Sequence, residues 1–303
     1  MLIHSSIKSS VEQITYLNNS IRIILRKLSN PNLKNLLLWT FRRNEIDVIH
    51  LYDYLSSMMQ VATNGNMLNF GYWDKETTDP VTAQTNLCEM VGNMSELDSA
   101  KNLLDVGSGF SEPAEIWKKK YHKLDITCLN INQNQLRFAK HLFNKKETST
   151  EFVNSTATYI PFKESSFDRI IALESAQHFK PFNKFVSESS HVLKKDGVLC
   201  IAIPILAETM GLEVFKMGIL KFTWYSEHYN FEILKKSLVS NGFEIIHNIH
   251  IGNMVYSPLA NYYMQNRENI KSKIVQKYPD YVEKILFKSI QKMREISEKK
   301  IID

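Results

Sequence analysis

The sequence predicts an α/β fold in which helices cover both faces of a mostly parallel sheet. From residue 101, short apolar runs alternate with stretches of helical periodicity, as in folds whose parallel strands are joined by right-handed crossovers. The run 198–205 is rich in β-branched residues and almost continuously apolar, which is typical of a strand buried on both faces. A third observation is the turn at Gly107 and Gly109, which separates an apolar run from a helical stretch and therefore indicates a strand–turn–helix unit.

The expected elements follow the spacing of apolar residues along the 303-residue chain. Apolar residues at three- and four-residue intervals predict helices over 5–28, a second helix ending near residue 54, and further helices over 112–120, 133–144, 182–193, 231–240 and within 260–300. Apolar runs predict strands over 103–106, 124–131, 151–154, 169–173, 198–205 and 243–251, with room for one more strand up to Tyr256. We expect three units, namely an N-terminal helical extension over 1–62, a central domain over 63–256 and a C-terminal helical segment over 257–303.

Composition and charge exclude several classes of protein. With 44% hydrophobic and 23% charged residues, the chain is neither disordered nor fibrous. Residues 1–50 and residues 265–303 each carry a net charge of +4, so the middle of the chain is mildly acidic, unlike the core of a nucleic-acid-binding protein. Solvated terminal helices explain this charge best, and contact with an anionic membrane surface is the alternative.

Cysteine usage and hydropathy bear on the cellular compartment. Cys88, Cys128 and Cys200 lie far apart without a C-x-x-C pair, which disfavours a disulfide framework or a thiolate metal site. We expect no metal site of another kind either, because the sequence lacks clustered ligands. No segment has the pattern of a signal peptide or of a membrane span of about 20 apolar residues. We therefore expect a cytoplasmic protein.

The segment 103–112 (LLDVGSGFSE) carries the strongest functional signal. Asp105 precedes two glycines that allow a tight turn and a close approach by a ligand, next to the free N–H groups of the following helix. A dinucleotide site requires a small third residue at the position of Glu112, whose negative charge would oppose a pyrophosphate. A hydride-transfer enzyme is therefore disfavoured.

The same segment resembles motif I of class I S-adenosylmethionine-dependent methyltransferases, in which an acidic residue precedes G-x-G-x-G and Ser111 here replaces the last glycine. Three further segments, 128–135, 154–168 and 171–179, follow in the order of this family. The resemblance implies S-adenosyl-L-methionine as the cofactor, bound through the residues at the family's motif positions, which are Asp105, Gly107, Ser108, Gly109, Asn130, Ile131, Gln135, Thr156, Ala157 and Glu174. Asn130 and Thr156 stand where most members have acidic residues. Helix capping is the alternative for Asn132.

Glu174 and His178 belong to a segment that resembles A-L-E-S-x-x-H of small-molecule O-methyltransferases and of their sterol and tocopherol relatives. Histidine has an ordinary pKa near 6.5, so His178 could take the proton of an attacking hydroxyl; Glu227 and His228 are the rival groups. The segment lacks the Asp/Asn-Pro-Pro-Tyr and Pro-Cys motifs of enzymes that methylate nucleic acids, and this disfavours RNA or DNA as the substrate.

An aromatic loop and a later insertion are candidates for contacts with the cofactor and the acceptor. The loop NFGYWD at 69–74 resembles H-[FY]-G-Y-W of sugar and polyketide O-methyltransferases, which implies cofactor contact by Tyr72 and acceptor contact by Trp73. The alternative for Trp73 is packing on the sheet. The insertion 206–230 follows the fifth strand, where this family builds a substrate lid, and its candidate acceptor-binding residues are Trp224, Tyr225 and His228.

Together these observations predict a Rossmann-like class I methyltransferase fold with a mostly parallel seven-stranded sheet and extra helices at both ends. The resemblance implies transfer of a methyl group to a hydroxyl of a small, partly apolar metabolite by a monomer or homodimer. Two alternatives stay open, namely C-methylation of a prenyl or sterol-like lipid, with Glu174 stabilising a carbocation, and a protein that binds the cofactor without catalysis.

Overall fold

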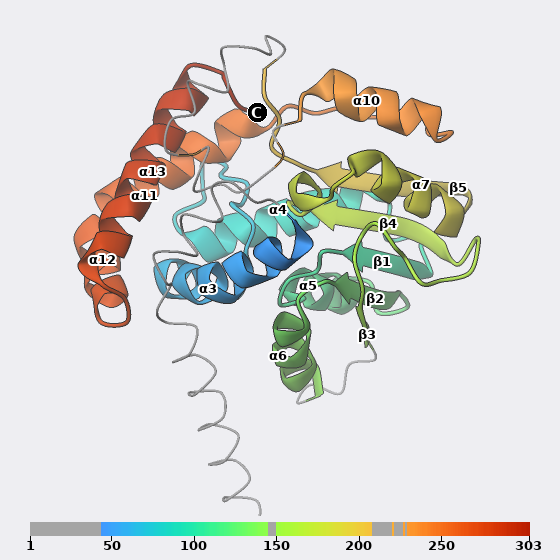
Figure 1. The fold of residues 1–303 in the computed structure, drawn as a ribbon, viewed down its shortest axis with the longest axis horizontal. Helices are drawn as coiled ribbons and strands as arrows, with labels where there is room; N and C mark the ends of the chain where they lie inside the picture. Colours follow the sequence, from blue (N-terminus) through green and yellow to red (C-terminus); the bar gives the residue numbers. More distant parts are fainter. Residues whose placement is uncertain (1–43, 145–149, 208–219, 221–226, 228) are drawn as a thin grey trace, which may run out of the picture.

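Five parallel strands form one sheet in the order β3-β2-β1-β4-β5 (Figure 1). The computed structural model describes residues 44–144, 150–207, 220, 227 and 229–303. The strands are β1 (Asn102–Val106), β2 (Asp125–Asn130), β3 (Thr150–Asn154), β4 (Phe167–Leu173) and β5 (Leu193–Ala202). In register, Asp105 of β1 lies between Cys128 of β2 and Ile171 of β4. Because the strand order reverses between β1 and β4, the crevice at their carboxyl ends is where ligands bind in sheets of this kind.

Helices cover both faces of the sheet, as the alternating pattern predicts. On one face, a core cluster joins the strands to α4 (Pro80–Met94), α5 (Glu112–Lys120) and α6 (Gln133–Asn144). On the other face, a second cluster joins them to α7 (Phe182–Val192) and α10 (Phe231–Ser240). Trp117 fixes the first layer, because its ring is fully buried and its indole N–H donates to the Cys88 carbonyl at 2.8 Å.

A separate group of helices lies beyond the sheet, on the left in Figure 1. It comprises α11 (Tyr256–Gln265), α12 (Arg267–Val275) and α13 (Asp280–Glu298), which share two further apolar clusters. Glu283 of α13 is fully buried and forms an ion pair with Arg267 at 3.0 Å, while the guanidinium lies 3.4 Å from the centre of the Phe287 ring. This paired, stacked arginine fixes α12 against α13.

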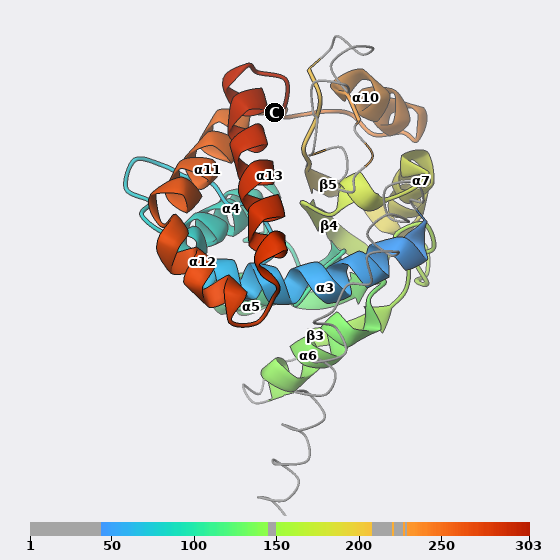
Figure 2. The same cartoon turned by 60° about the vertical axis from the view of Figure 1, so that its left-hand side comes forward.

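Helix α3 (Glu45–Thr63) connects the two groups, since it contacts α12 and also hydrogen-bonds to residues that follow β2 and β4 (Figure 2). It begins at Asn44, whose side chain accepts a hydrogen bond from the Asp47 N–H at 2.9 Å. It extends nine residues beyond the end expected at Tyr54, because the apolar contacts of Met58 and Val61 with the C-terminal helices continue its buried face.

The structure differs from the predicted seven-stranded sheet in its last part. Among the described residues there are five strands, and Phe243 to Ile251 have no regular secondary structure. This segment lines a groove together with β5 but forms no ladder with it, and Ile246 and Ile249 remain exposed. Tyr256 begins α11 and does not end a strand.

Several other expectations can be compared directly with the structure. The helices expected over 112–120, 133–144 and 231–240 are confirmed to the residue. The helix expected over 5–28 and most of the insertion 206–230 lie outside the described residues. In the part of the chain that the structure describes, no helix is both long and apolar enough to cross a membrane.

Candidate active site

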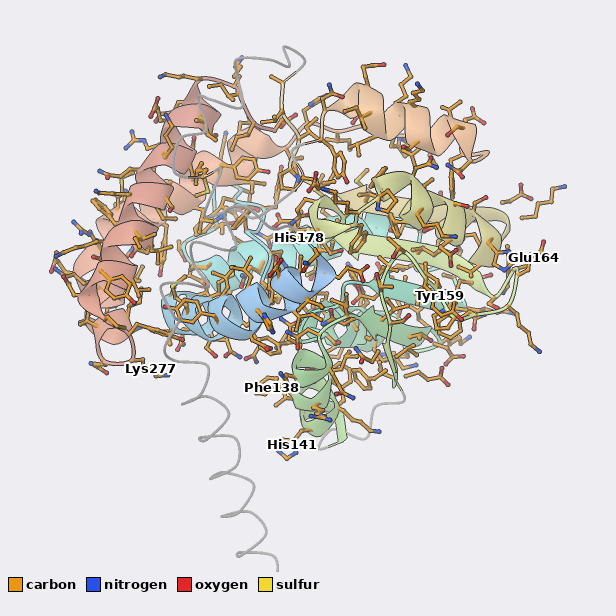
Figure 3. The ribbon with its side chains drawn as sticks, viewed as in Figure 1. Phe138, His141, Tyr159, Glu164, His178 and Lys277 are labelled. Atoms are coloured by element: carbon orange, nitrogen blue, oxygen red, sulfur yellow. The ribbon has the colours of Figure 1, made fainter. Side chains whose placement is uncertain are left out.

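A pocket of about 1000 Å³, counting the space at its mouth, lies at the carboxyl ends of β1, β2 and β4. It therefore lies at the switch point of the sheet, where the fold alone predicts a ligand. The structure brings to it eleven of the residues chosen from the sequence, namely Asp105, Gly107, Ser108, Gly109, Asn130, Ile131, Gln135, Thr156, Ala157, Glu174 and His178. Figure 3 shows His178 near the middle of the molecule, whereas Glu164, His141 and Lys277 lie at its edges.

The glycine turn forms one wall of this pocket. Gly107 and Gly109 have φ of +77° and +55°, a region that glycine adopts without strain. A Cβ on Gly107 would lie 2.5 Å from the Ser175 Cβ, so the turn packs directly against the end of β4. The N–H groups of Gly107 and Ser108 donate to the Leu129 carbonyl at 2.8 and 3.2 Å. These two amides therefore fix the turn to β2 and are not directed at a ligand.

Two carboxyl groups, those of the buried Asp105 and the half-buried Glu174, face the pocket. Asp105 is 2% exposed, and its Oδ2 has no hydrogen-bond partner among the described residues. Burial raises the pKa of Asp105 to about 7. Burial likewise raises the pKa of Glu174 to about 8, although the Phe70 N–H donates to its Oε2 at 2.8 Å. No lysine or arginine occurs among the described residues that line the pocket, so a cationic ligand would stabilise both carboxylates.

Glu174 also has an uncommon backbone conformation. Its φ is +46°, in the left-handed region, directly after the last residue of β4. Such conformations cost free energy for a residue with a side chain, and they cluster at functional sites. The following short 3₁₀ turn, Ala176–His178, then brings His178 to the same end of the pocket.

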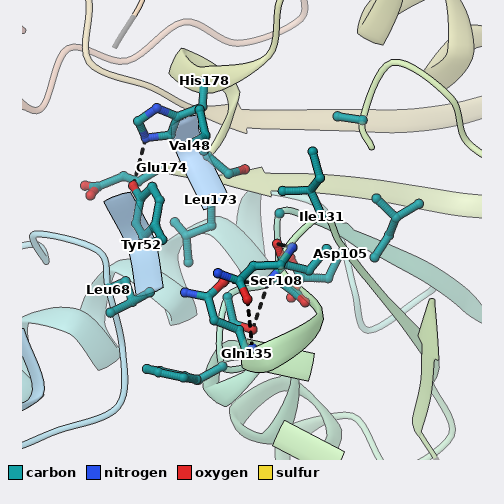
Figure 4. A pocket seen from close by; sticks show the side chains of 18 of the residues that line it. Val48, Tyr52, Leu68, Asp105, Ser108, Ile131, Gln135, Leu173, Glu174 and His178 are labelled. Atoms are coloured by element: carbon teal, nitrogen blue, oxygen red, sulfur yellow. Dashed lines mark hydrogen bonds between the residues drawn. The ribbon is translucent and has the colours of Figure 1, made fainter. Parts of the chain in front are cut away.

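Tyr52 of α3, which was not predicted from the sequence, completes this end of the pocket. Its hydroxyl lies 2.8 Å from His178 Nε2, with the two rings edge to face at 5.2 Å (Figure 4). Burial raises the pKa of Tyr52 well above its ordinary value, and the nearby Glu174 adds to the shift. The hydroxyl therefore stays protonated, and it donates to His178 Nε2 in the neutral tautomer that carries its proton on Nδ1.

The opposite end of the pocket is held by a network of amide side chains. Asn130 Nδ2 donates to Gln135 Oε1 at 2.7 Å and to the Gly109 carbonyl at 3.2 Å, and Gln135 Nε2 donates to Ser56 of α3 at 2.9 Å. Asn132 caps α6, because its Oδ1 accepts from the N–H groups of Asn134 and Gln135 at 2.9 and 3.1 Å. The capping alternative is thus confirmed for Asn132.

Glu45 of α3 supplies a carboxylate where the sequence pattern lacks one. It lines the pocket and accepts hydrogen bonds from the hydroxyls of Thr156 and of Thr158, the latter at 3.2 Å. Thr156 occupies the position at which the resembling family has an aspartate. The acidic group therefore comes from a helix more than 100 residues away in sequence.

The aromatic loop approaches the site differently from the expectation. Tyr72 packs against the first core cluster, and the buried Trp73 donates its indole N–H to the Phe70 carbonyl at 3.2 Å and contacts Tyr262. Neither residue lines the pocket; Leu68 and Asn69 do. The positive φ of Gly71 and the hydrogen bond from the Tyr72 N–H to the Ala83 carbonyl turn the two aromatic residues away from the pocket. Trp73 is therefore a packed side chain, as the alternative had it, but it packs against Tyr262 of α11 and not on the sheet.

The remaining candidates lie mainly in the insertion. Trp224, Tyr225 and His228 are outside the described residues. Glu227 is described, and it forms an ion pair with Lys180 at 3.1 Å. The structure does not bring it to the pocket.

Sequence reasoning missed the contribution of α3, whose pocket-lining residues are Glu45, Val48, Ile49 and Tyr52. Their three- and four-residue spacing shows that they share one helix face. That spacing could have grouped them, but it could not show that this face covers the pocket, because the contact depends on packing between distant segments.

Comparison with known proteins gives a consistent result. Residues 104–201 match a family model described as a methyltransferase domain. The chain is 26% identical over 54% of its length to an erythromycin 3''-O-methyltransferase of Saccharopolyspora erythraea, covering 54% of that protein. It is 30% identical over 54% of its length to a 27-O-demethylrifamycin SV methyltransferase of Amycolatopsis mediterranei, covering 60% of that protein. The chain thus spans between half and two thirds of the length of these relatives.

The fold is similar to that of solved structures across most of the chain. One of them is the cyclopropane synthase MmaA2 of Mycobacterium tuberculosis, which superposes with a TM-score of 0.73 at 15% identity. The match covers 87% of this chain and 97% of that one. At this identity the likeness concerns the fold, and it includes the α/β sheet and its flanking helices.

Proposed function

We propose that this chain is a class I S-adenosylmethionine-dependent methyltransferase that transfers a methyl group to a hydroxyl of a small, partly apolar metabolite, and the match of residues 104–201 to a family model described as a methyltransferase domain supports this proposal. The observation that carries the proposal is the pair of carboxyl groups of the buried Asp105 and the half-buried Glu174, which face one pocket whose described lining holds no lysine or arginine. S-adenosylmethionine carries two positive charges, one on its ammonium and one on its sulfonium, so the donor set fits this cofactor.

The residues of the pocket divide into two groups by the part of the cofactor that they would hold. Asp105, Glu174 and the glycine turn suit the charged methionine portion, because carboxylates stabilise cations. Asn130, Gln135 and Glu45 suit the ribose and the adenine, because they offer polar atoms at the far end of the pocket. Bound there, S-adenosylmethionine supplies an electrophilic methyl group on its sulfonium.

Tyr52 and His178 suit the removal of the acceptor's proton. An acceptor hydroxyl that donates to Tyr52 Oη can pass its proton to that oxygen while Tyr52 passes its own proton to His178 Nε2. Tyr52 ends this step neutral, the imidazole ends it as imidazolium, and the acceptor oxygen keeps the electron pair of its broken O–H bond, with which it can form the new bond to the methyl carbon, so charge is conserved. The sequence predicted that the acceptor's proton passes directly to His178. Because the Tyr52 hydroxyl is already hydrogen-bonded to His178 Nε2, we propose that the proton passes through that hydroxyl instead.

We also propose that the catalytic unit extends beyond residues 63–256. The N-terminal extension over 1–62 includes most of α3, which supplies Tyr52 and Glu45 to the pocket. The C-terminal segment over 257–303 is a helical addition that packs against α3.

Isotope transfer tests the function. The full chain would be incubated with S-adenosylmethionine carrying a ¹³C-methyl group and with an extract of the source cells, and the labelled product would be examined by carbon NMR. The expected result is a methyl carbon bonded to oxygen. A methyl carbon bonded to carbon would instead support alkene methylation, and absence of any transfer in the presence of cofactor binding would leave a binding protein without catalysis.

A further inference from the structure

We propose that the acceptor is an amphiphile whose apolar body, about 15 Å long, lies in a chamber between α3 and the C-terminal helices. This inference rests on the proposed function, because it assigns the acceptor side of the same site. The chamber has a volume of about 1700 Å³, counting the space at its mouth. It is distinct from the cofactor pocket but adjoins it, since both cavities share Tyr52, Leu68, Glu174 and His178.

The chemistry of the chamber changes along its length. At the end next to the cofactor pocket, Glu174, His178 and Tyr52 provide polar atoms. Farther from it the walls are aliphatic and aromatic, with Met58 and Met59 on α3 facing Ile285 and Ile290 on α13. No lysine, arginine or aspartate occurs among the described residues that line it. One polar end and a long apolar interior match a molecule with a single polar head.

The dimension of the chamber follows from the helix that forms its wall. Both Tyr52 and Ala62 of α3 line it, and ten residues of α-helix rise about 15 Å. An extended hydrocarbon of roughly ten to twelve carbon atoms has this length. The wall opposite α3 is held in place by the ion pair of Arg267 with the buried Glu283, which fixes α12 against α13, so the chamber keeps its dimensions and selects for chain length.

Chain-length dependence of binding tests this inference without any methyl transfer. The affinities of 1-hexanol, 1-octanol, 1-decanol and 1-dodecanol would be measured by calorimetry on the full chain with S-adenosylhomocysteine bound. Each added CH₂ is expected to raise the affinity about fourfold, up to a plateau at roughly ten to twelve carbons. Affinity that does not change with chain length would overturn the proposal and would indicate that the chain's own residues fill the chamber.

Two substitutions locate the binding site. Ala62→Trp on α3 and Ile285→Trp on α13 narrow the far end from opposite walls, and each should move the plateau to shorter alcohols. His50→Trp is the matched control, because His50 lies on the exposed face of α3, and it should leave the plateau unchanged. S-adenosylhomocysteine affinity in each variant reports whether the fold is intact. A plateau that is unchanged in both folded variants would contradict the assignment.

The outcomes separate this inference from the proposed function. Length-dependent binding without transfer of a labelled methyl group to any acceptor would leave the chamber assigned and the proposed function wrong. Methyl transfer to acceptors together with length-independent binding of alcohols would leave the proposed function intact and the assignment of the chamber wrong.

Discussion

Asp105 and Glu174 predict how cofactor affinity changes with pH. Without a ligand their pKa values are raised by burial to about 7 and about 8, so both groups are largely protonated below neutral pH. The ammonium and sulfonium groups of S-adenosylmethionine favour the ionised carboxylates, so carboxyl groups that are protonated in the free protein must lose their protons when the cofactor binds. S-adenosylmethionine affinity should therefore rise with pH up to about 8 and fall below it, by up to about tenfold per pH unit for each carboxyl.

The accompanying proton release can be measured directly. Titrations of S-adenosylmethionine in two buffers of different ionisation enthalpy should show release of one to two protons near pH 6.5. Asp105→Asn removes one of the two groups, so this variant should bind more weakly and release fewer protons. An affinity that stays constant between pH 6 and pH 8 would mean that these carboxylates do not hold the cation.

The position of Glu45 predicts a specific effect on recognition of the adenine of the cofactor. If its carboxylate accepts a hydrogen bond from the adenine amino group, Glu45→Gln should weaken S-adenosylhomocysteine binding by about ten- to hundredfold, the value of a hydrogen bond to a charged group. The inosine analogue of the same ligand has a carbonyl at that position. The wild-type chain should therefore bind the analogue poorly, and Glu45→Gln should bind the two ligands more equally. If the wild-type chain and Glu45→Gln discriminate equally between S-adenosylhomocysteine and its inosine analogue, the adenine does not bind at Glu45.

Tyr52 and His178 should act as one unit in catalysis. His178→Ala and Tyr52→Phe should each lower kcat by about 10²- to 10⁴-fold, because a positioned base is lost, and the double variant should be little worse than His178→Ala. Cofactor affinity serves as the control and should change only a few-fold. A severe loss in Glu174→Gln with a mild loss in His178→Ala would favour carbocation chemistry and carbon methylation.

At the scale of elements, α3 should control cofactor affinity by its docking on the loop after β2. Asp53 of α3 accepts hydrogen bonds from the side chains of Asn132 at 2.8 Å and Asn134 at 3.2 Å. Asp53→Ala removes both, so we expect roughly tenfold weaker binding of S-adenosylhomocysteine because Glu45 and Tyr52 move with the helix. The control is His50→Ala, on the exposed face of the same helix. Unchanged affinity in Asp53→Ala would show that docking of α3 does not matter.

The elements also show which parts of this fold can be predicted from sequence. The units β1–α5 and β2–α6 are local, since each strand, turn and helix is encoded within about 20 residues, and their bounds were predicted closely. Helix α4 was not predicted, although Asp79 and Pro80 provide an N-cap and a favoured first residue. The late segment near Ile246 alternates like a strand, but β5 does not pair with it, and pairing is a property of the sheet and not of the segment.

The candidate site divides in the same way. Asp105, Gly107 and Glu174 follow strands directly, so parallel topology alone brings them to one edge of the sheet. Tyr52 reaches His178 across 126 positions of sequence, and nothing in the local pattern around Tyr52 encodes that contact. Tyr72 and Trp73 show the opposite case, because a motif predicted cofactor contact for Tyr72 and acceptor contact for Trp73, whereas Tyr72 packs against the first core cluster and Trp73 packs against Tyr262.

At the scale of the whole molecule, the two cavities meet at the few residues that would carry the chemistry. The cofactor pocket is built by the sheet and α3, and the chamber is built by α3 and the C-terminal helices. Helix α3 is therefore common to both cavities, and Tyr52 lies where they join. With the methyl donor in the cofactor pocket and the acceptor in the chamber, the two molecules would meet at Tyr52 and His178.

Calorimetry of cofactor binding tests the central claim most directly. S-adenosylmethionine and S-adenosylhomocysteine should each bind the full chain with a dissociation constant in the low micromolar range, about −8 kcal/mol, while NAD should give no heat of binding. Binding of NAD with no binding of either methionine derivative would contradict the account.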